Sequence, residues 1–167
     1  MKKTVKLGLV QMEITQNIEK NLEKMLAYIK ASSSEILIFP ELALTGYQNF
    51  RKLSKESIEE ALLEIQKNLS QKVLLLGSPV IYKDFYTNGY LSLSENGIQL
   101  LAEKEVLFPG LDDKVYLKPG HVRHIFTYED IRLGILICFE LRCPEIARFY
   151  IGLGVDGLII PAQWPES

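Results

Sequence analysis

Short apolar segments alternate with amphipathic helical patterns over residues 5–76, and this alternation limits the possible fold more than any other feature of the chain. Apolar residues recur at helical spacing over 17–31 and again over 57–69. Apolar runs at 35–39 and 73–76 have the length of buried strands, and a first strand is expected within 5–13. Strands that alternate with helices predict a layered α/β domain whose helices pack against a sheet.

Local signals predict where several of these elements begin and end. Ser57 and Glu60 have capping-box spacing, which predicts the start of the second helix. After residue 80 the turn signals Asn88-Gly89 and Glu95-Asn96-Gly97 predict a β meander. Further along the chain we expect paired strands at 122–127 and 131–137 and a last strand at 155–160. Between them, a helix should begin at Pro144 and end near Gly154. Its inward-facing residues should be Ile146, Phe149, Tyr150 and Leu153.

Size and composition narrow the class of protein. The 167 residues, 47% of them hydrophobic and 24% charged, predict one globular domain over 1–167. A net charge of -2 gives no general attraction to nucleic acid, and no apolar run approaches the ~18 residues of a membrane span. Cys138 and Cys143 lie too close together to form a disulfide framework, which favours a reducing cytosol. We expect small molecules or other protein chains as partners.

Three residues combine into a possible catalytic set. Cys138 ends an apolar run just before a turn, where a chain can present a nucleophilic thiol. Such a thiol needs a base or a positive neighbour to raise its thiolate fraction. Glu41, at the end of a buried strand, can be the base, and Lys104 can stabilise the negative charge of a tetrahedral intermediate. The backbone N–H of Phe139 can complete an oxyanion site.

The segments around these residues resemble the three ordered motifs of the nitrilase superfamily, the carbon–nitrogen hydrolases. The matching segments are Phe39–Tyr47, Lys104–Pro109 and Leu136–Glu145. The resemblance implies a four-layer α-β-β-α sandwich and hydrolysis of non-peptide carbon–nitrogen bonds by an amidase-like route through a cysteine thioester. It also implies that Glu41 is the general base, Lys104 the transition-state stabiliser and Cys138 the nucleophile, with no cofactor and no metal.

Further residues are expected to support the site, and the same resemblance assigns one of them. A second family glutamate, which orients the base and the lysine, corresponds to Asp113, with Asp112 adjacent; aspartate is one methylene shorter. Lys114 is the second choice for the lysine. Arg142 is expected to support the nucleophile turn by pairing with Glu145, or else to contact a substrate carboxylate. Trp164 either lines the mouth of the substrate pocket or only packs.

Family members are longer than this chain, so the resemblance implies a sandwich that is incomplete at its C-terminus. The chain is then a truncated product, one part of a split enzyme, or a reduced version covered by another subunit. We therefore expect a homo-oligomer or a partner that supplies the missing part.

Two alternative functions stay open: a catalytically inactive remnant that serves as a binding or assembly module, and a redox sensor that uses Cys138 and Cys143. His121 and His124 lack the acidic or thiol neighbours of a zinc site, so no metal is expected there.

Overall fold

The computed structural model describes residues 4–48, 50–109 and 113–164. Its helices and strands alternate at both ends of the chain around a central antiparallel region, as the sequence predicts. In chain order the elements are β1 (Leu7–Leu9), α1 (Ile18–Ala31), β2 (Ile36–Ile38), η1 (Phe50–Lys52), α2 (Lys55–Lys67), β3 (Val73–Ile81), β4 (Tyr86–Ser94), β5 (Gly97–Glu103), α3 (Asp113–Tyr116), β6 (Phe126–Tyr128), β7 (Ile131–Ile135), η2 (Cys138–Arg142), α4 (Pro144–Gly152) and β8 (Gly157–Ile159).

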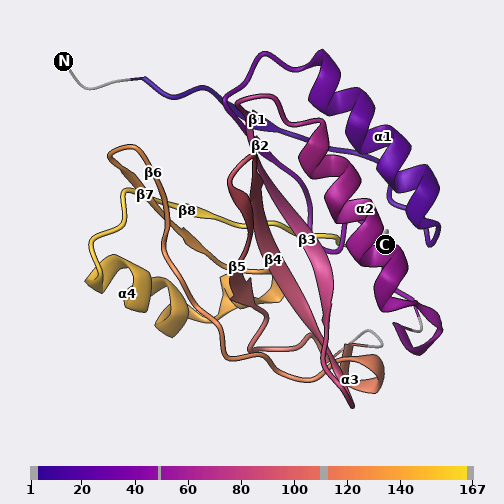
Figure 1. Cartoon of the computed structure of the whole chain (residues 1–167). Helices are drawn as coiled ribbons and strands as arrows, with labels where there is room; N and C mark the ends of the chain where they lie inside the picture. Colours follow the sequence, from indigo (N-terminus) through magenta and orange to yellow (C-terminus); the bar gives the residue numbers. More distant parts are fainter. Residues whose placement is uncertain (1–3, 49, 110–112, 165–167) are drawn as a thin grey trace.

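The strands form two sheets. The larger sheet has the order β1-β2-β3-β4-β5, in which β1, β2 and β3 are parallel and β3, β4 and β5 are antiparallel (Figure 1). The smaller sheet has the order β6-β7-β8, with β8 parallel to β7. Within the described residues β1 and β8 are therefore edge strands, each paired on one side.

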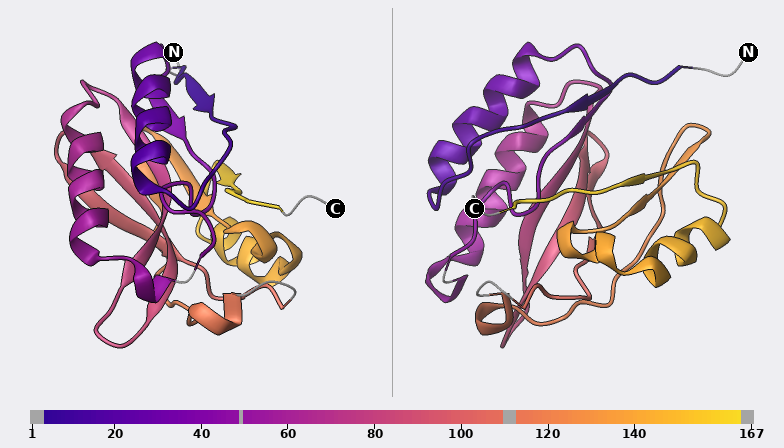
Figure 2. Two further views of the ribbon diagram at one scale, coloured as in Figure 1. Left: turned by 90° about the vertical axis from the view of Figure 1, so that its right-hand side faces the viewer. Right: turned by 180° about the vertical axis from the view of Figure 1, so that it is seen from behind.

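The two sheets pack face to face, with helices on both outer faces (Figure 2). Helices α1 and α2 bury their apolar stripes against the outer face of the larger sheet, and α4 covers the outer face of the smaller one. In β2, Ile36 and Ile38 point into the layer between the sheets while Leu37 points toward the helices, because side chains alternate along a strand. The layers are helix, sheet, sheet, helix, so the expected α-β-β-α sandwich is confirmed.

Two local predictions are wrong. Helix α2 begins at Lys55, and Ser54 is its N-cap, because the Ser54 hydroxyl oxygen accepts a hydrogen bond from the Ser57 N–H at 3.0 Å. The pair Asn88-Gly89 lies inside β4 instead of forming a turn, and Gly89 pairs with Ser78 of β3. The turn between β3 and β4 lies at 82–85 instead. The turn at Glu95 and Asn96 is confirmed.

Strand β3 is longer than the predicted 73–76 and continues through Pro79. Proline has no backbone N–H to donate to a neighbouring strand, so it is tolerated in a strand only where one side of that strand has no partner. Strand β2 pairs only with Val73–Leu75, so β3 beyond that point pairs with β4 alone.

Helix α4 begins at Pro144 as predicted and buries Ile146 and Tyr150 against the smaller sheet. The expectation that Phe149 and Leu153 also face inward is wrong, because Phe149 is exposed on the helix and Leu153, its C-cap, is exposed just after it. No helix in 4–48, 50–109 or 113–164 is both long and apolar enough to cross a membrane.

Candidate active site

Glu41 is held by a tight turn that lies directly on strand β3. The turn follows β2 and passes through Leu42, whose φ is 46°, and Gly46, whose φ is 63°. A Cβ on Gly77 of β3 would lie 2.3 Å from the Leu42 nitrogen and 2.5 Å from the Pro40 carbonyl oxygen. Because only glycine allows this close approach of two backbones, Gly77 lets the Glu41 side chain be fully buried.

Lys104 follows β5 and lies between two carboxylates. Its Nζ is 2.8 Å from Glu41 Oε1 and 2.8 Å from Asp113 Oδ2, and all three side chains are fully buried. Burial alone lowers the pKa of Lys104, but the two carboxylates outweigh it and hold that pKa above its ordinary value. Lys114 is exposed, so the structure brings Lys104 and not Lys114 to Glu41.

Asp113 reaches Lys104 although its side chain is one methylene shorter than glutamate. It is the first residue of α3, and its Oδ2 also accepts a hydrogen bond from the Phe108 N–H at 3.0 Å. This second contact fixes the carboxylate beside the ammonium group. Asp112, the neighbouring candidate, lies outside the described residues.

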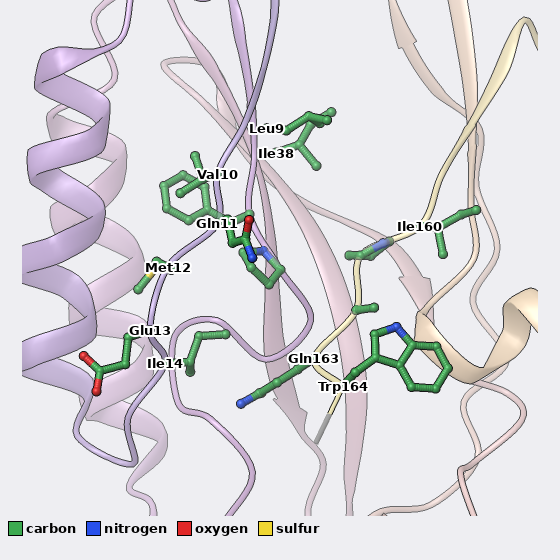
Figure 3. A pocket seen from close by; sticks show the side chains of 14 residues that line it. Leu9, Val10, Gln11, Met12, Glu13, Ile14, Ile38, Ile160, Gln163 and Trp164 are labelled. Carbon is green, nitrogen blue, oxygen red and sulfur yellow. The ribbon is translucent and has the colours of Figure 1, made fainter. Parts of the chain in front are cut away.

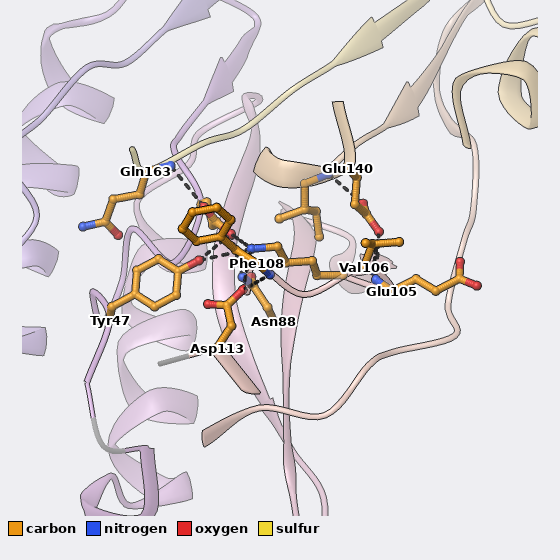
Figure 4. Close-up of polar contacts among 11 residues, drawn as sticks. Tyr47, Asn88, Glu105, Val106, Phe108, Asp113, Glu140 and Gln163 are labelled. Atoms are coloured by element: carbon orange, nitrogen blue, oxygen red, sulfur yellow. Dashed lines mark hydrogen bonds and ion pairs between the residues drawn. The ribbon is translucent and has the colours of Figure 1, made fainter. Parts of the chain in front are cut away.

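The two oxygens of Glu41 have different surroundings (Figure 4). Oε1 accepts hydrogen bonds from Lys104 Nζ at 2.8 Å, from the Tyr47 hydroxyl at 2.7 Å and from Asn88 Nδ2 at 2.8 Å. Oε2 accepts one from the Gln163 backbone N–H at 3.1 Å. With three donors on Oε1, Oε2 is the oxygen with more acceptor capacity left for a reacting proton.

Sequence reasoning missed the contributions of Tyr47, Asn88 and Gln163. Tyr47 stood within a recognised motif without a role, and Asn88 was taken for a turn residue. The available signal for Asn88 was its place two residues before Tyr90, which puts both side chains on the same face of β4. Burial, with the charges of Glu41 and Asp113, raises the pKa of Tyr47 far above its ordinary value, so its hydroxyl remains a donor.

Cys138 is the first residue of η2 and has a left-handed backbone with a φ of 52°. Its N–H donates to the Pro161 carbonyl oxygen at 2.9 Å, and its side chain is buried beside Glu41. Burial raises the pKa of the Cys138 thiol to about 12; the charge of Glu41 and a hydrogen bond to it add to this effect, while Lys104 opposes it. The resting sulfur is thus a protonated thiol next to a base.

A cation and two aromatic rings lie next to the nucleophile turn. The Arg142 guanidinium carbon is 5.8 Å from the centroid of the Phe139 ring and 5.8 Å from that of Trp164. The expected pairing of Arg142 with Glu145 is wrong: the described part of the chain shows no ion pair between them, since the guanidinium lies over the rings. Half of the Trp164 side chain is exposed.

Trp164 also lines an open groove of about 710 Å³ (Figure 3). Its walls are the segments 9–14, 38–40 and 160–164, which come from both sheets. Pro40 and Gln163 belong to these walls and lie beside Glu41, whereas Lys104 and Cys138 do not line the groove. The groove therefore runs past the catalytic candidates on the side of the edge strands.

No group of three or more metal-binding side chains occurs in the part of the chain that the structure describes, His121 and His124 included. Two buried oxygens near Lys104, Asn88 Oδ1 and Asp113 Oδ1, have no hydrogen-bond partner among the described atoms. Such acceptors can receive N–H groups.

Comparison with known proteins identifies the family of this chain. The carbon-nitrogen hydrolase family profile matches residues 6–166. A 2-oxoglutaramate amidase from Bacillus subtilis is 29% identical over 154 residues, which are 87% of this chain and 60% of that protein. An omega-amidase from Bos taurus is 24% identical over 96% of this chain and 64% of its own length.

Solved structures show the same fold. An amidase of the nitrilase superfamily from Nesterenkonia superposes with a TM-score of 0.84 at 18% identity, covering 98% of this chain and 66% of that one. A glutamine-dependent NAD+ synthetase from Acinetobacter baumannii gives a TM-score of 0.80 at 23% identity, covering 99% of this chain and 33% of that one. The chain spans about three fifths of the length of the Bacillus subtilis amidase and of a probable nitrilase from Schizosaccharomyces pombe. With its profile match over nearly the whole chain, this protein belongs to the carbon–nitrogen hydrolase family, the nitrilase superfamily.

Proposed function

We propose that the protein hydrolyses non-peptide carbon–nitrogen bonds, foremost those of small amides, through a thioester on Cys138. One observation carries the proposal: a single buried carboxylate, Glu41, holds the Lys104 ammonium group at 2.8 Å and, through its charge, also raises the pKa of the buried Cys138 thiol. A thiol, a base and a cation at one point are the groups that acyl transfer to cysteine requires. A carbamoyl compound or a nitrile needs the same groups. We prefer an amide because amide hydrolysis is the commoner activity implied by the family resemblance, and two of the relatives are amidases.

In the first half of the reaction, Cys138 Sγ forms a bond to the amide carbon while Glu41 takes the thiol proton. Because the pKa of the thiol is about 12, this transfer accompanies the attack instead of preceding it. Lys104 and the Phe139 N–H stabilise the oxyanion. The carbon–nitrogen bond then breaks, and Glu41 passes its proton to the departing amine or ammonia.

In the second half, water attacks the thioester carbon as Glu41 takes one of its protons. The carbon–sulfur bond breaks, the acid leaves, and the proton returns to the Cys138 sulfur. Asp113, Tyr47 and Asn88 hold Lys104 and Glu41 in place throughout. The carboxylate cycles between its two protonation states, so the chemistry consumes only water and needs no cofactor.

For the substrate we propose a small amide that also carries a carboxylate. The name of one relative, 2-oxoglutaramate amidase, describes an enzyme for such an amide, and another relative is an omega-amidase. Arg142 is an exposed cation at the nucleophile turn and can pair with the carboxylate, while Trp164 borders the approach. Because the mechanism uses a free thiol, and Cys138 and Cys143 are both free, we place the protein in the reducing cytosol.

We propose that a second copy of the chain, or a partner that carries the rest of a family domain, covers the groove. Leu9 of the edge strand β1 is 81% exposed, and Ile160 after β8 is 40% exposed. Exposed apolar residues beside unpaired strand edges favour association. Light scattering during size-exclusion chromatography tests this: a monomer at micromolar concentration, unchanged by Leu9→Lys, would contradict self-association.

The direct test of activity is ammonia release from small amides such as succinamic acid, with Cys138→Ala as the control. We expect release from the wild type and none from the variant, together with an acyl adduct on Cys138 in the intact mass of the wild type. Equal release from both proteins would remove the proposal.

The second candidate is an inactive binding or assembly module. The open groove favours it, since this surface beside Glu41 is uncovered among the described residues. It predicts that neither protein releases ammonia while the chain still binds a partner through β1. The redox alternative predicts a reversible Cys138–Cys143 disulfide, seen as a loss of two mass units on mild oxidation.

A further inference from the structure

Glu140, two residues after the nucleophile, is fully buried, and the mechanism above does not use it. Its two oxygens bind different parts of the site. Oε2 accepts the N–H of Ile137, the residue before Cys138, at 2.8 Å. Oε1 accepts the N–H of Glu105, the residue after Lys104, at 2.7 Å, and Figure 4 shows these groups side by side. One carboxylate thus joins the backbone before the thiol to the backbone after the ammonium group.

Arg123 completes this arrangement. Its Nη2 lies 3.2 Å from Glu140 Oε1, and its Nε donates to Glu105 Oε2 at 3.0 Å. The buried charge of Glu140 is therefore paired, as a buried carboxylate requires. The 3.4 Å contact from the Val106 N–H to Oε1 adds a fourth donor.

All of these partners are donors, so the site requires a group that only accepts hydrogen bonds. Carboxylate meets this requirement at both oxygens, whereas an amide has one oxygen and one NH2 group. Glutamine at this position would place its NH2 against an N–H donor and leave one backbone group unsatisfied. The four donors therefore require a charged carboxylate at position 140, with one oxygen near Ile137 and the other near Glu105.

The other contacts of the two segments do not replace this link. The Cys138 N–H bonds to Pro161, beyond strand β8, and the Lys104 N–H bonds to Asn88 of β4. Those bonds anchor each segment to its own sheet: Cys138 to the smaller one and Lys104 to the larger one. Glu140 crosses from one sheet to the other at the level of the reacting groups.

We infer that Glu140 is a positioning residue, which sets the separation between the Cys138 thiol and the Glu41–Lys104 pair by joining the two sheets at residues 137 and 105. The inference rests on the proposed function for its catalytic meaning. Its geometric part concerns where the thiol lies and is testable without turnover. A displacement of 1 Å between reacting groups costs about 10²-fold in rate.

The test compares Glu140→Gln with Glu105→Gln. Glu105 is paired with the same arginine but, through its side chain, holds neither catalytic segment, so it is the matched control. For each folded protein, intact mass gives the rate of Cys138 alkylation by iodoacetamide at several pH values, in a Cys143→Ser background. Urea unfolding of the same proteins measures stability separately.

We expect Glu140→Gln to shift the pH profile of Cys138 alkylation toward that of a free thiol, because the thiol leaves the field of Glu41. Where the wild type is active, kcat falls by about 10²-fold while KM changes less than threefold. Glu105→Gln leaves the profile and kcat unchanged. A role in stability alone lowers the unfolding midpoint without moving the profile, and that outcome would overturn the inference.

Glu140→Asp covers the case in which the glutamine variant does not fold. Aspartate keeps the charge but is one methylene too short to reach both segments, so we expect a folded protein with a shifted profile. An unshifted profile in Glu140→Asp would also overturn the inference. If the wild type hydrolyses no amide but its profile still moves with Glu140, the proposed function fails while the positioning role stands.

Discussion

Replacing Glu41 by glutamine should affect two reactions of Cys138 in opposite directions. Glu41 is the proposed base for amide hydrolysis, and its loss should lower kcat by about 10²–10⁴-fold. The same carboxylate raises the pKa of the thiol through its charge and its hydrogen bond, so its removal makes the thiolate easier to form. Lys104, which favours the thiolate, remains paired with Asp113 at 2.8 Å, so its buried positive charge is still compensated in the variant.

The size of the effect follows from the pKa. With the thiol at about 12, thiolate makes up about one part in 10⁴ at pH 8. Each unit by which the pKa falls gives about tenfold more thiolate of about threefold lower nucleophilicity, a net gain of about three- to fourfold in alkylation rate. Burial, the largest cause of the raised pKa, persists in the variant, so alkylation should still be slower than that of a free cysteine.

The assay is time-resolved intact mass during treatment with iodoacetamide at pH 7 to 10, followed by peptide mapping. Cys143, a partly buried thiol at the N-cap of α4, is the internal control and should react equally in both proteins. Slower or unchanged alkylation of Cys138 in Glu41→Gln would refute the proposed contact between the two side chains. Undiminished hydrolysis in the same variant would refute the role of Glu41 as base.

Three further predictions concern the support of the site. Lys104→Met leaves the buried carboxylates of Glu41 and Asp113 without a counter-charge. The free energy of unfolding measured by urea titration should therefore fall by about 3–5 kcal/mol. A loss below about 1 kcal/mol would contradict the buried pairing. Gly77→Ala should lower the free energy of unfolding by about 1–3 kcal/mol, because the added Cβ meets backbone atoms and not a flexible side chain. It should also displace Glu41 and lower the activity at least tenfold. Gly152→Ala is the control, and it should leave stability and activity unchanged because the space around Gly152 is open. Burial raises the pKa of Glu103, but the hydrogen bonds that its carboxylate accepts outweigh this effect and lower that pKa. Its contribution to the free energy of unfolding is therefore complete above the ordinary value of about 4.3 and is lost as pH falls through the lower folded value. Glu103→Gln should make the free energy of unfolding fall less steeply at acid pH, and the same acid dependence in both proteins would contradict this role of Glu103.

The layered fold was predictable because its signal is local. Helical periodicity over 17–31 and 57–69 and the apolar runs between them reflect burial on one face, which each segment carries in its own residues. The boundaries were less predictable: Ser54 and Ser57 both suit an N-cap, and only the observed hydrogen bond separates them.

The candidate site was predictable where it follows a recognisable motif and not elsewhere. Glu41, Lys104 and Cys138 stand in three motifs and come together in the structure. Asn88 carries the sequence signature of a turn, yet pairing with β3 keeps it inside a strand and its amide reaches a carboxylate 47 residues away. Long-range contacts of this kind leave no local pattern, and the same holds for the backbone N–H of Gln163 on Glu41.

The left-handed backbone of Cys138 has a consequence for how such a chain evolves. A side chain at a φ of 52° costs about 1 kcal/mol relative to glycine, which adopts that conformation freely. Mutation to glycine would relieve this strain but would leave the space of a buried side chain unfilled within a packed cluster. The two effects oppose each other, so backbone strain alone gives drift no bias toward replacing the nucleophile, even where its chemistry is lost.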